Sequence, residues 1–301
     1  MSTIDKIKDL KKQRDAVILA HYYVDDEVQK IADFVGDSFY LSKIAAAAEA
    51  KTILFCGVSF MGESAKILSP QKTVIMPDLG ADCPMAHMAD PAKIAQMRRE
   101  YPDLAVVCYI NSTAALKACS DVCVTSSNAL KIIKALPNRD IYFIPDENLG
   151  RYVASKVPQK HFIFNDGFCH VHKEITAQDV RQAKKAHSKA ELLVHPECTP
   201  DVTGIADYIG STSGIIDYAT ESKAEEFIVC TELGVLYELK RKNPRKRFYP
   251  AKKQQCCPDM KRISLEKVAE ALEQMSNVVE MEEEIRLLAK KPLERMLELG
   301  Q

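Results

Sequence analysis

The sequence lacks a long apolar run and carries almost no net charge. No stretch of its 301 residues reaches the ~18 apolar residues that a membrane-spanning helix needs. The N-terminal stretch MSTIDKIKDLKKQRD is charged throughout and has no apolar core of the kind that a secretory signal contains. The net charge of −1 gives no indication of a nucleic-acid partner. We therefore expect a cytoplasmic protein that has neither a membrane nor a nucleic acid as its partner.

Several common signatures of cofactor and nucleotide binding are also missing. The chain contains no G-x-G-x-x-G, Walker A or H-E-x-x-H motif, which argues against dinucleotide, nucleoside-triphosphate and zincin sites. One basic run, KRKNPRKRFYPAKK at residues 240–253, lacks the interleaved aromatic residues of an RNA-binding motif. We interpret it as a solvated helix end and loop.

Cysteine, by contrast, is plentiful, with ten in the chain. Thiols stay reduced in the cytoplasm, so we expect metal ligands, reactive thiols or core residues rather than disulfides. Cys56, Cys108 and Cys230 lie in apolar, strand-like runs and are expected in the core. Cys119 and Cys123 form a C-x3-C pair, but no second pair completes a zinc site. The remaining cysteines lie in loop-like stretches and are the functional candidates: Cys83, Cys169, Cys198, Cys256 and Cys257.

Three segments, starting at residues 16, 105 and 191, repeat one pattern. Each begins with an apolar run typical of a buried strand, followed by polar residues, a short helix, a second short strand and a hydroxyl cluster that begins a helix. Each continues with strand, polar turn, helix and a last strand, after which comes Cys83, Cys169 or Cys257, at spacings of 86 and 88 residues. The spacing favours Cys257 over Cys256, although a one-residue insertion would reverse the choice.

This repeat predicts the fold. Strands that alternate with helices are typical of parallel sheets covered by helices on both faces. Three repeats of about 87 residues therefore predict an α/β protein of three α/β/α domains with pseudo-threefold symmetry around a central site. The expected domains span 1–82, 83–168 and 169–262. Residues 263–301 predict two more helices, which we expect to pack on the first domain.

Polar residues follow the first strand of each repeat, where ligands bind in open α/β sheets. If the domains face inward, these residues meet at one site and provide general acid–base candidates from every domain. They are His21 and Tyr23, Tyr109 and Asn111, and His195 and Glu197.

Hydroxyl residues at the start of the next helix in each repeat suit an anionic ligand. A helix N-terminus has free N–H groups and a partial positive charge, which attract carboxylate or phosphate. Simple N-capping explains any one of these hydroxyls, but three at equivalent places favour a substrate rich in negative charge. They are Ser38, Ser126 and the pair Ser211 and Thr212.

Three cysteines, one from each domain, would make an unusual metal site. A [4Fe–4S] cluster usually has four cysteine ligands, so with three one iron is open to water or substrate and acts as a Lewis acid. Zinc bound by Cys169 with His170 or His172 is an alternative, and inert buried cysteines are another.

A series of motifs, in order along nearly the whole chain, resembles the quinolinate synthase family of NAD biosynthesis. The motifs are AHYY, GDS, FMGESAKIL, CPMA, YINST, TSSNA, PDENLG, GFCHVH, HPEC, GSTSG and CPDMK. The resemblance implies three α/β domains around a [4Fe–4S] cluster, one per chain, held by three cysteines. It implies a transferase that condenses iminoaspartate, made by L-aspartate oxidase, with dihydroxyacetone phosphate to give quinolinate, phosphate and water.

The resemblance also implies roles for single residues. The cluster ligands would be Cys83, Cys169 and Cys257, and Tyr23 and Glu197 would handle protons, with His21 and His195 as further catalytic groups. The substrate contacts would be His21, Ser38, Tyr109, Asn111, Ser126, His195, Glu197 and Thr212. Tyr22, His170 and the extra Cys256 depart from the pattern of the family.

Two other classes of function compete with this hypothesis. A non-enzymatic iron–sulfur sensor would need an added DNA-reading element, and the sequence has none that we recognise. A zinc-dependent lyase would use the Cys169 group described above, and its preparation would be colourless rather than brown.

Overall fold

A computed structural model describes residues 2–301 of the protein as an α/β fold with three parallel four-stranded sheets. In each sheet the chain runs first through an inner strand, then an edge strand, then the other inner strand and the other edge, giving the orders β2-β1-β3-β4, β6-β5-β7-β8 and β10-β9-β11-β12. The strands are β1 (Ala16–His21), β2 (Phe34–Gly36), β3 (Thr52–Cys56), β4 (Thr73–Ile75), β5 (Leu104–Tyr109), β6 (Val122–Val124), β7 (Asp140–Ile144), β8 (His161–Phe164), β9 (Glu191–Val194), β10 (Tyr208–Ile209), β11 (Glu226–Cys230) and β12 (Arg247–Pro250). The identical topology confirms the predicted threefold repeat.

Helices surround each sheet in the same order along the chain. One helix precedes each sheet, and further helices connect its strands. The helices are α1 (Thr3–Gln13), α2 (Asp26–Ile31), α3 (Ser38–Ala47), α4 (Ser59–Leu68), α5 (Pro91–Glu100), α6 (Ala114–Ala118), α7 (Ala129–Ala135), α8 (Glu147–Ser155), α9 (His170–Lys173), α10 (Ala177–Ala186), α11 (Pro200–Thr203), α12 (Thr212–Glu221), α13 (Val235–Lys242), α14 (Leu265–Gln274) and α15 (Glu283–Leu299), with 3-10 turns η1 (Pro84–His87) and η2 (Met260–Arg262). We call α1–β4, α5–β8 and α10–β12 the first, second and third units.

The inner strands are apolar because helices cover both faces of the sheets. Every residue of β3 and β5 is buried, and β-branched and aromatic side chains make up at least half of each strand. Such continuous apolar runs are typical of parallel sheets that are buried on both sides. The expected alternation of strand and helix in the sequence therefore corresponds to real three-layer units.

One aspartate holds the edge strand of each unit in the same way. Asp33, Asp121 and Asp207 precede β2, β6 and β10, and each accepts a hydrogen bond from a backbone N–H of the neighbouring inner strand. The acceptor–donor distances are 2.9, 2.7 and 2.7 Å. This shared hydrogen bond explains why an aspartate recurs at this point of all three units.

A lysine near the fourth strand of each unit is repeated as well. Backbone carbonyl groups at or just beyond the C-terminal ends of α3, α7 and α12 accept hydrogen bonds from Lys72, Lys160 and Lys246, respectively. Lys160 does so at 2.7 and 2.6 Å, to Leu136 and Asn138. Each lysine satisfies carbonyl groups that a helix end leaves without an intrahelical partner.

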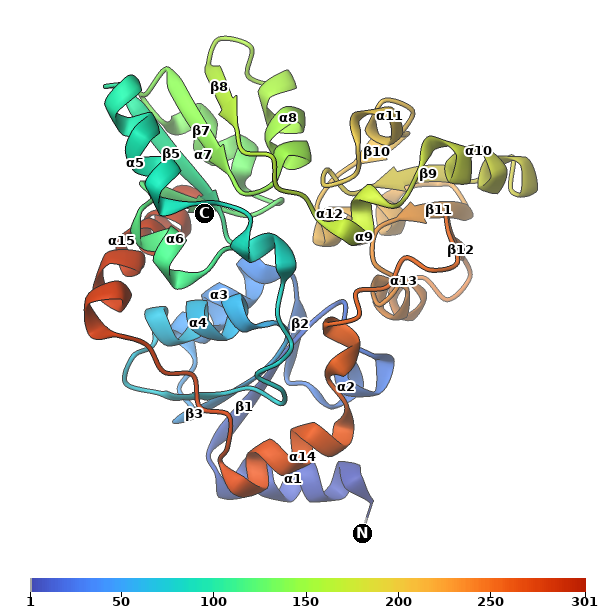
Figure 1. The fold of residues 1–301 in the computed structure, drawn as a ribbon. Coiled ribbons are helices and arrows are strands. Elements are labelled where there is room, and N and C mark those ends of the chain that lie inside the picture. Colours follow the sequence, from blue (N-terminus) through green and yellow to red (C-terminus); the bar gives the residue numbers. More distant parts are fainter. Residues whose placement is uncertain (1) are drawn as a thin grey trace.

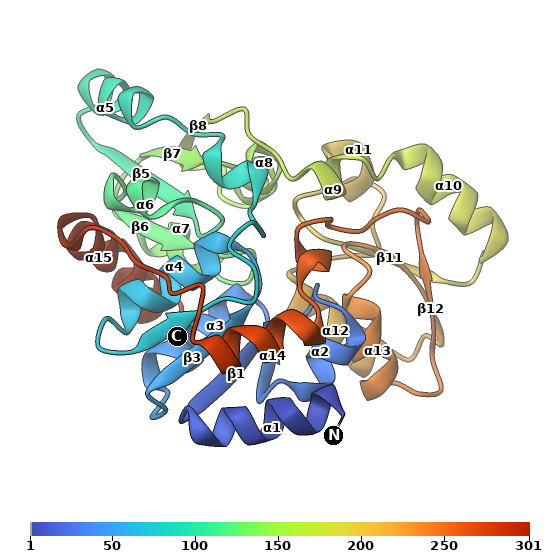
Figure 2. The same ribbon diagram turned by 60° about the horizontal axis from the view of Figure 1, so that its bottom comes forward.

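The units form three lobes around a common centre, as Figures 1 and 2 show from two directions. In Figure 1 the first unit lies at the bottom, the second at the upper left and the third at the upper right. The segments that follow β4, β8 and β12 carry Cys83, Cys169 and Cys257 toward the middle of the molecule. The exact domain boundaries stay a prediction.

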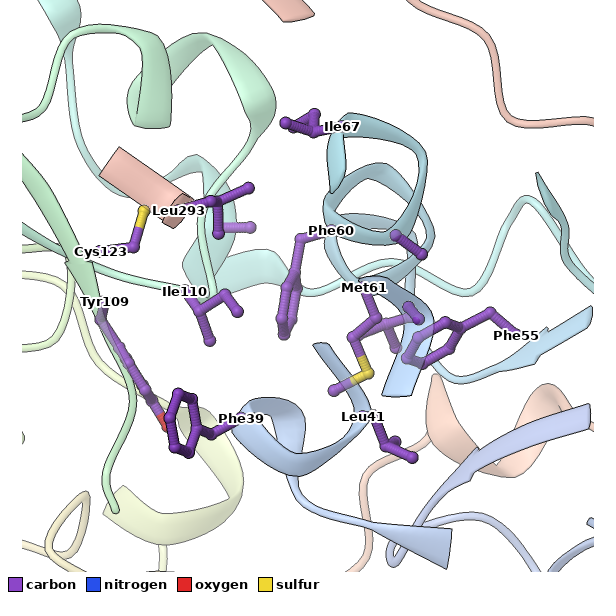
Figure 3. Packing of buried hydrophobic residues seen from close by; sticks show 14 of the residues in the cluster. Phe39, Leu41, Phe55, Phe60, Met61, Ile67, Tyr109, Ile110, Cys123 and Leu293 are labelled. Carbon is purple, nitrogen blue, oxygen red and sulfur yellow. The ribbon is translucent and has the colours of Figure 1, made fainter. Parts of the chain in front are cut away.

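The first two units share one apolar core, whereas the third has its own. Phe60 of α4 and Ile110, just after β5, belong to one continuous cluster, and Figure 3 shows them side by side. The core residues of the third sheet form two separate clusters, one of which also includes Tyr22. The third unit therefore packs on the first through Tyr22, with Tyr23 and Val35 beside it, rather than through the shared core.

The two C-terminal helices do not both lie where we expected them. Helix α14 packs on α1 of the first unit, as expected. Helix α15 instead lies mainly on α6 and β6 of the second unit and also touches α4 (Figure 1). Leu293 of α15 is buried in the core that the first two units share, so this helix joins them.

Among residues 2–301, we find no helix with the length and apolar content required to span a bilayer.

Candidate active site

One cavity at the centre of the molecule brings the predicted site residues together. Its wall includes residues from all three units, in agreement with the expected position beyond the carboxyl ends of the inner strands. All of the residues to which the resemblance assigns a part in binding metal or substrate, or in catalysis, line it: His21, Tyr23, Ser38, Cys83, Tyr109, Asn111, Ser126, Cys169, His195, Glu197, Thr212 and Cys257.

The three repeat-equivalent cysteines differ from the others in where their thiols lie. Cys83, Cys169 and Cys257 line the cavity, whereas Cys256 is exposed and Cys198 is buried against the third sheet. Burial raises the pKa of all three cavity thiols, that of Cys257 to about 11. They are close enough that negative charge on Cys83 raises the pKa of Cys169 further. A soft, positively charged metal group would relieve this by binding them as thiolates.

His21 and His195 occupy equivalent places after β1 and β9 and have the same hydrogen bond. The backbone N–H of Tyr23 donates to His21 Nδ1 at 3.2 Å, and that of Glu197 donates to His195 Nδ1 at 3.3 Å. Nδ1 is thus an acceptor, and in the neutral ring the hydrogen lies on Nε2. Burial lowers the pKa of each histidine to about 3, although the charge of Glu197 opposes this shift. Both rings therefore present a neutral Nε2–H donor, which in His195 faces Ser126 Oγ at 3.2 Å.

Glu197 is buried between two partners from different elements. Tyr109 donates its phenol hydrogen to Oε1 at 2.5 Å, and His172 Nδ1 lies 2.7 Å from Oε2. Since a carboxylate only accepts, His172 carries a hydrogen on Nδ1. Burial by itself would raise the pKa of Glu197, but His172 and His195 outweigh it and hold the value at about 2. Glu197 is therefore an anion at neutral pH.

The other side of His172 leads to Tyr23. His172 Nε2 lies 2.9 Å from Thr231 Oγ1, and Thr231 Oγ1 lies 2.7 Å from the phenol oxygen of Tyr23. The same phenol oxygen is 2.8 Å from Thr212 Oγ1. Burial and the charge of Glu197 raise the pKa of Tyr23, so its phenol stays protonated.

These contacts form one hydrogen-bonded chain across the units. It runs from Tyr23 through Thr231 and His172 to Glu197, and ends at Tyr109. In the tautomer of His172 that carries its hydrogen on Nδ1, every donor in this chain points toward an acceptor, in the order from Tyr23 to Glu197. A proton leaving Tyr23 can therefore reach His172, where the carboxylate of Glu197 stabilises the resulting imidazolium.

Sequence reasoning missed the roles of two of the five residues in this chain. His172 was considered only as a zinc ligand, and Thr231 was not considered at all. A signal was available for Thr231, because it directly follows the inner strand β11, just as His195, which lines the cavity, directly follows β9.

Cys169, His172 and Glu197 form the one group in residues 2–301 whose ligand atoms would suit a single metal ion, with those atoms within 4.8 Å of one another. Zinc with bonds of 2.0–2.3 Å to tetrahedral ligands would separate those atoms by roughly 3.3–3.6 Å. His172 Nδ1 is only 2.7 Å from Glu197 and 3.2 Å from Cys169 Sγ. These spacings are typical of direct hydrogen bonds, so the group fits the relay better than a zinc site.

The expected hydroxyl residues lie at helix starts in two of the three units. Helix α3 begins at Ser38 after the cap Asp37, and α12 begins at Thr212 after the cap Ser211. In the second unit the expectation is wrong, because α7 begins only at Ala129 and Ser126 lies in the turn before it. Ser126 still reaches the cavity, through the turn that Asn128 closes by accepting from the Thr125 N–H.

Asn111 lines the cavity with a polar atom that has no protein partner. Its Oδ1 is buried and accepts no hydrogen bond from any of residues 2–301. Buried polar groups are almost always hydrogen-bonded, so this oxygen is free to accept from a ligand or a water in the cavity.

The sequence of nearly the whole chain is similar to that of known proteins. A family model described as "Quinolinate synthetase A protein" matches residues 5–298. The chain is 52% identical over 295 residues to a quinolinate synthase of Caldicellulosiruptor saccharolyticus, covering 98% of this chain and 97% of the relative. It is 50% identical over 296 residues to a quinolinate synthase of Clostridioides difficile, with coverage of 98% and 97%. A relative from Methanosarcina acetivorans, named "Quinolinate synthase 2", is 46% identical over 296 residues.

Proposed function

Because the chain belongs to the quinolinate synthetase A family, we propose that it condenses iminoaspartate with dihydroxyacetone phosphate to give quinolinate, phosphate and water. Membership makes it an enzyme of NAD biosynthesis that acts on small molecules. The observation that carries the proposal is the central cavity, to which each of the three repeats contributes one cysteine and at least one acid–base or hydroxyl side chain.

We propose that Cys83, Cys169 and Cys257 hold one [4Fe–4S] cluster per chain. The donor set fits, because three thiols of the kind that iron–sulfur clusters prefer line one cavity and no further cysteine of residues 2–301 lines it. A cluster bound there would supply an iron without a protein ligand, whose Lewis acidity assists the loss of water that forms an aromatic ring.

The remaining wall suits two anionic substrates. Iminoaspartate has two carboxylates and dihydroxyacetone phosphate has a phosphate, and the free N–H groups at the start of α3 and α12 attract such groups. Neutral His21 and His195 offer Nε2–H donors, and Ser38, Ser126 and Thr212 offer hydroxyls. We assign the unpaired Asn111 amide to a polar group of the substrate.

We assign proton transfer to the chain that ends in Tyr23. Schiff-base formation and tautomerisation need a group that gives and takes a proton at a fixed position. The Tyr23 phenol can do so because Thr231 and His172 accept its proton in turn, and Glu197 holds the charge that this creates. Glu197 thus acts on the proton through His172, and its second oxygen orients Tyr109.

The proposed substrate implies a supplier. Iminoaspartate is an imine, which water hydrolyses readily. It therefore has to be consumed soon after the oxidation of L-aspartate that produces it. We propose functional coupling to L-aspartate oxidase on this basis.

A zinc-dependent lyase remains the rival, since Cys169, His172 and Glu197 lie together. Anaerobic purification followed by iron and sulfide analysis separates the two, together with a quinolinate assay that contains both substrates. We expect a brown protein with about four irons and four sulfides per chain, and quinolinate formation that depends on both substrates. A colourless, zinc-containing protein that forms no quinolinate would refute the proposal.

A further inference from the structure

Each of the three cavity cysteines donates its backbone N–H to a carboxylate. The Cys83 N–H donates to Asp82 Oδ1 at 2.8 Å, the Cys169 N–H to Asp146 Oδ2 at 3.2 Å, and the Cys257 N–H to Glu232 Oε1 at 3.2 Å. The repeat by itself does not account for this shared contact, because the three carboxylates come from two different places in the repeat.

Asp146 and Glu232 occupy the same place in their units. Each follows an inner strand by two residues, β7 and β11 respectively, at the entrance to the next helix. Each also uses its second oxygen locally, Asp146 to accept from the Leu149 N–H at 2.7 Å and Glu232 from the Gly234 N–H at 2.6 Å. One carboxylate therefore ties the turn before the helix to the cysteine of the next segment.

The first unit has Val58 at this place, which shows that the fold tolerates an apolar residue there. Cys83 takes its carboxylate from the adjacent residue Asp82 instead. Asp82 is itself held by Ser59, the residue after Val58, and by His87 at 2.7 Å. The contact to the cysteine amide thus recurs although the residue that supplies it differs.

Burying these carboxylates costs stability that a purely structural residue would avoid. Asp146 and Glu232 are both 0% exposed. Moving a carboxylate out of water is unfavourable unless hydrogen bonds or opposite charge compensate it. Glu232 has such a charge in Lys261, at 3.4 Å, but Asp146 has no basic partner within ion-pair distance among residues 2–301. A valine at both positions, as in the first unit, would avoid the cost of burying a carboxylate.

Glu232 also connects its cysteine to the catalytic chain. Lys261, which pairs with Glu232, donates to the backbone carbonyl of Tyr23 at 2.8 Å and pairs with Asp25 at 3.2 Å. The segment that carries Cys257 is therefore tied to the loop that carries Tyr23 through a carboxylate and an amine.

We propose that Asp146 and Glu232 are positioning residues, which hold the backbone of Cys169 and Cys257 so that both thiols face the cavity before a cluster binds. The inference rests on the proposed function, because it assigns these residues to the proposed cluster ligands. It concerns how the ligands are held and assigns neither residue a step in the reaction.

The test compares Asp146→Asn and Glu232→Gln with the wild-type protein. Both changes keep the size of the side chain, but an amide has one acceptor atom where the carboxylate has two, so one of the two N–H groups loses its partner. Residues that orient metal ligands typically change metal affinity about 10–100-fold when mutated. We expect both variants to release iron to a chelator about 10–100-fold faster than wild type under anaerobic conditions, with less iron and sulfide bound after reconstitution.

Asp207→Asn is the matched control. Asp207 also accepts a backbone N–H through its carboxylate, from Leu192 at 2.7 Å, but it lies at the outer edge of the third unit and does not line the cavity. We expect this variant to lower the melting temperature of the cluster-free protein while leaving the rate of iron release unchanged.

The outcomes are separable. Iron release from both cavity variants at the wild-type rate, or at the rate of Asp207→Asn, would overturn the inference. So would loss of the folded circular dichroism spectrum in both variants without cluster, because the carboxylates would then hold the fold itself. A wild-type protein that binds no iron would instead overturn the proposed function.

Discussion

The phenol of Tyr23, in the first unit, and the hydroxyl of Thr231, in the third, lie 2.7 Å apart. This contact joins residues 208 positions apart in the sequence. It completes a path from the predicted proton-handling tyrosine to Glu197, because Thr231 also lies 2.9 Å from His172 Nε2. Thr231 is therefore the residue at which this path can be tested.

Thr231→Val should interrupt proton transfer without disturbing the fold. The two side chains have nearly the same shape, but valine has no hydroxyl between Tyr23 and His172. We expect turnover to fall about 10²–10⁴-fold, the typical effect of losing an acid–base group. Thr231→Ser keeps the hydroxyl and should recover most of the rate. Equal rates in the valine and serine variants would contradict the relay.

Glu197→Gln should leave cluster content intact but remove most turnover. The change is nearly isosteric, yet it removes the negative charge that stabilises a protonated His172 and the second acceptor that receives the Tyr109 phenol. We expect a loss of about 10²–10⁴-fold in kcat with an unchanged absorption spectrum near 400 nm. Near-normal turnover would refute the assigned role.

The adjacent cysteines 256 and 257 should differ sharply in effect. Cys257 lines the cavity and Cys256 is exposed. Cys257→Ser should give a nearly colourless, inactive protein, whereas Cys256→Ser should keep both iron content and activity. The opposite result would identify Cys256 rather than Cys257 as the ligand. Loss of iron and activity in both variants would refute the model of one cysteine ligand per unit.

The two buried histidines should make the cluster-free protein less stable in acid. Burial lowers the pKa of His21 and His195 to about 3, from an unfolded value near 6.5. Below pH 6.5 the unfolded chain binds protons that the folded protein does not, so stability falls as the pH drops from about 6.5 toward about 3. Each histidine contributes a slope of about 1.4 kcal/mol per pH unit in this window.

Urea unfolding at several pH values between 7 and 4 measures this slope. His195→Asn should reduce it by about the contribution of one histidine, since asparagine retains an acceptor near Nδ1 but does not titrate. His161→Asn is the control, because that histidine is largely exposed on β8 and pairs with Asp140. An unchanged slope in His195→Asn would show that this ring is not held neutral.

Oxygen should inactivate the enzyme. With only three cysteines on the cavity wall, one iron of the proposed cluster lacks a protein ligand, and such an iron is readily lost on oxidation. We expect activity and iron content to fall together during aerobic handling with a chelator, and to return after anaerobic reconstitution. Full activity after prolonged aerobic chelation would count against the cluster.

Much of the fold could be predicted because its information is local and is repeated three times. A run such as AVVCY is apolar enough to identify a buried strand by itself, and the recurrence of the run and of the following polar residues identified the three units. The repeat also identified Cys83, Cys169 and Cys257 and their common place at the centre. Parallel strands present their carboxyl ends on one edge, so position in the repeat was enough to predict position in space.

Other features were decided only when the units packed against one another. The sequence places Thr231 directly after a strand, but its role depends on Tyr23 approaching from the first unit and His172 from α9. Helix α15 has an amphipathic pattern that would suit several apolar faces, and it packs mainly on α6 and β6 of the second unit while also touching α4 of the first. Local periodicity determines which side chains share a face, whereas contacts between distant segments depend on the shape and charge of surfaces that exist only after each unit has folded.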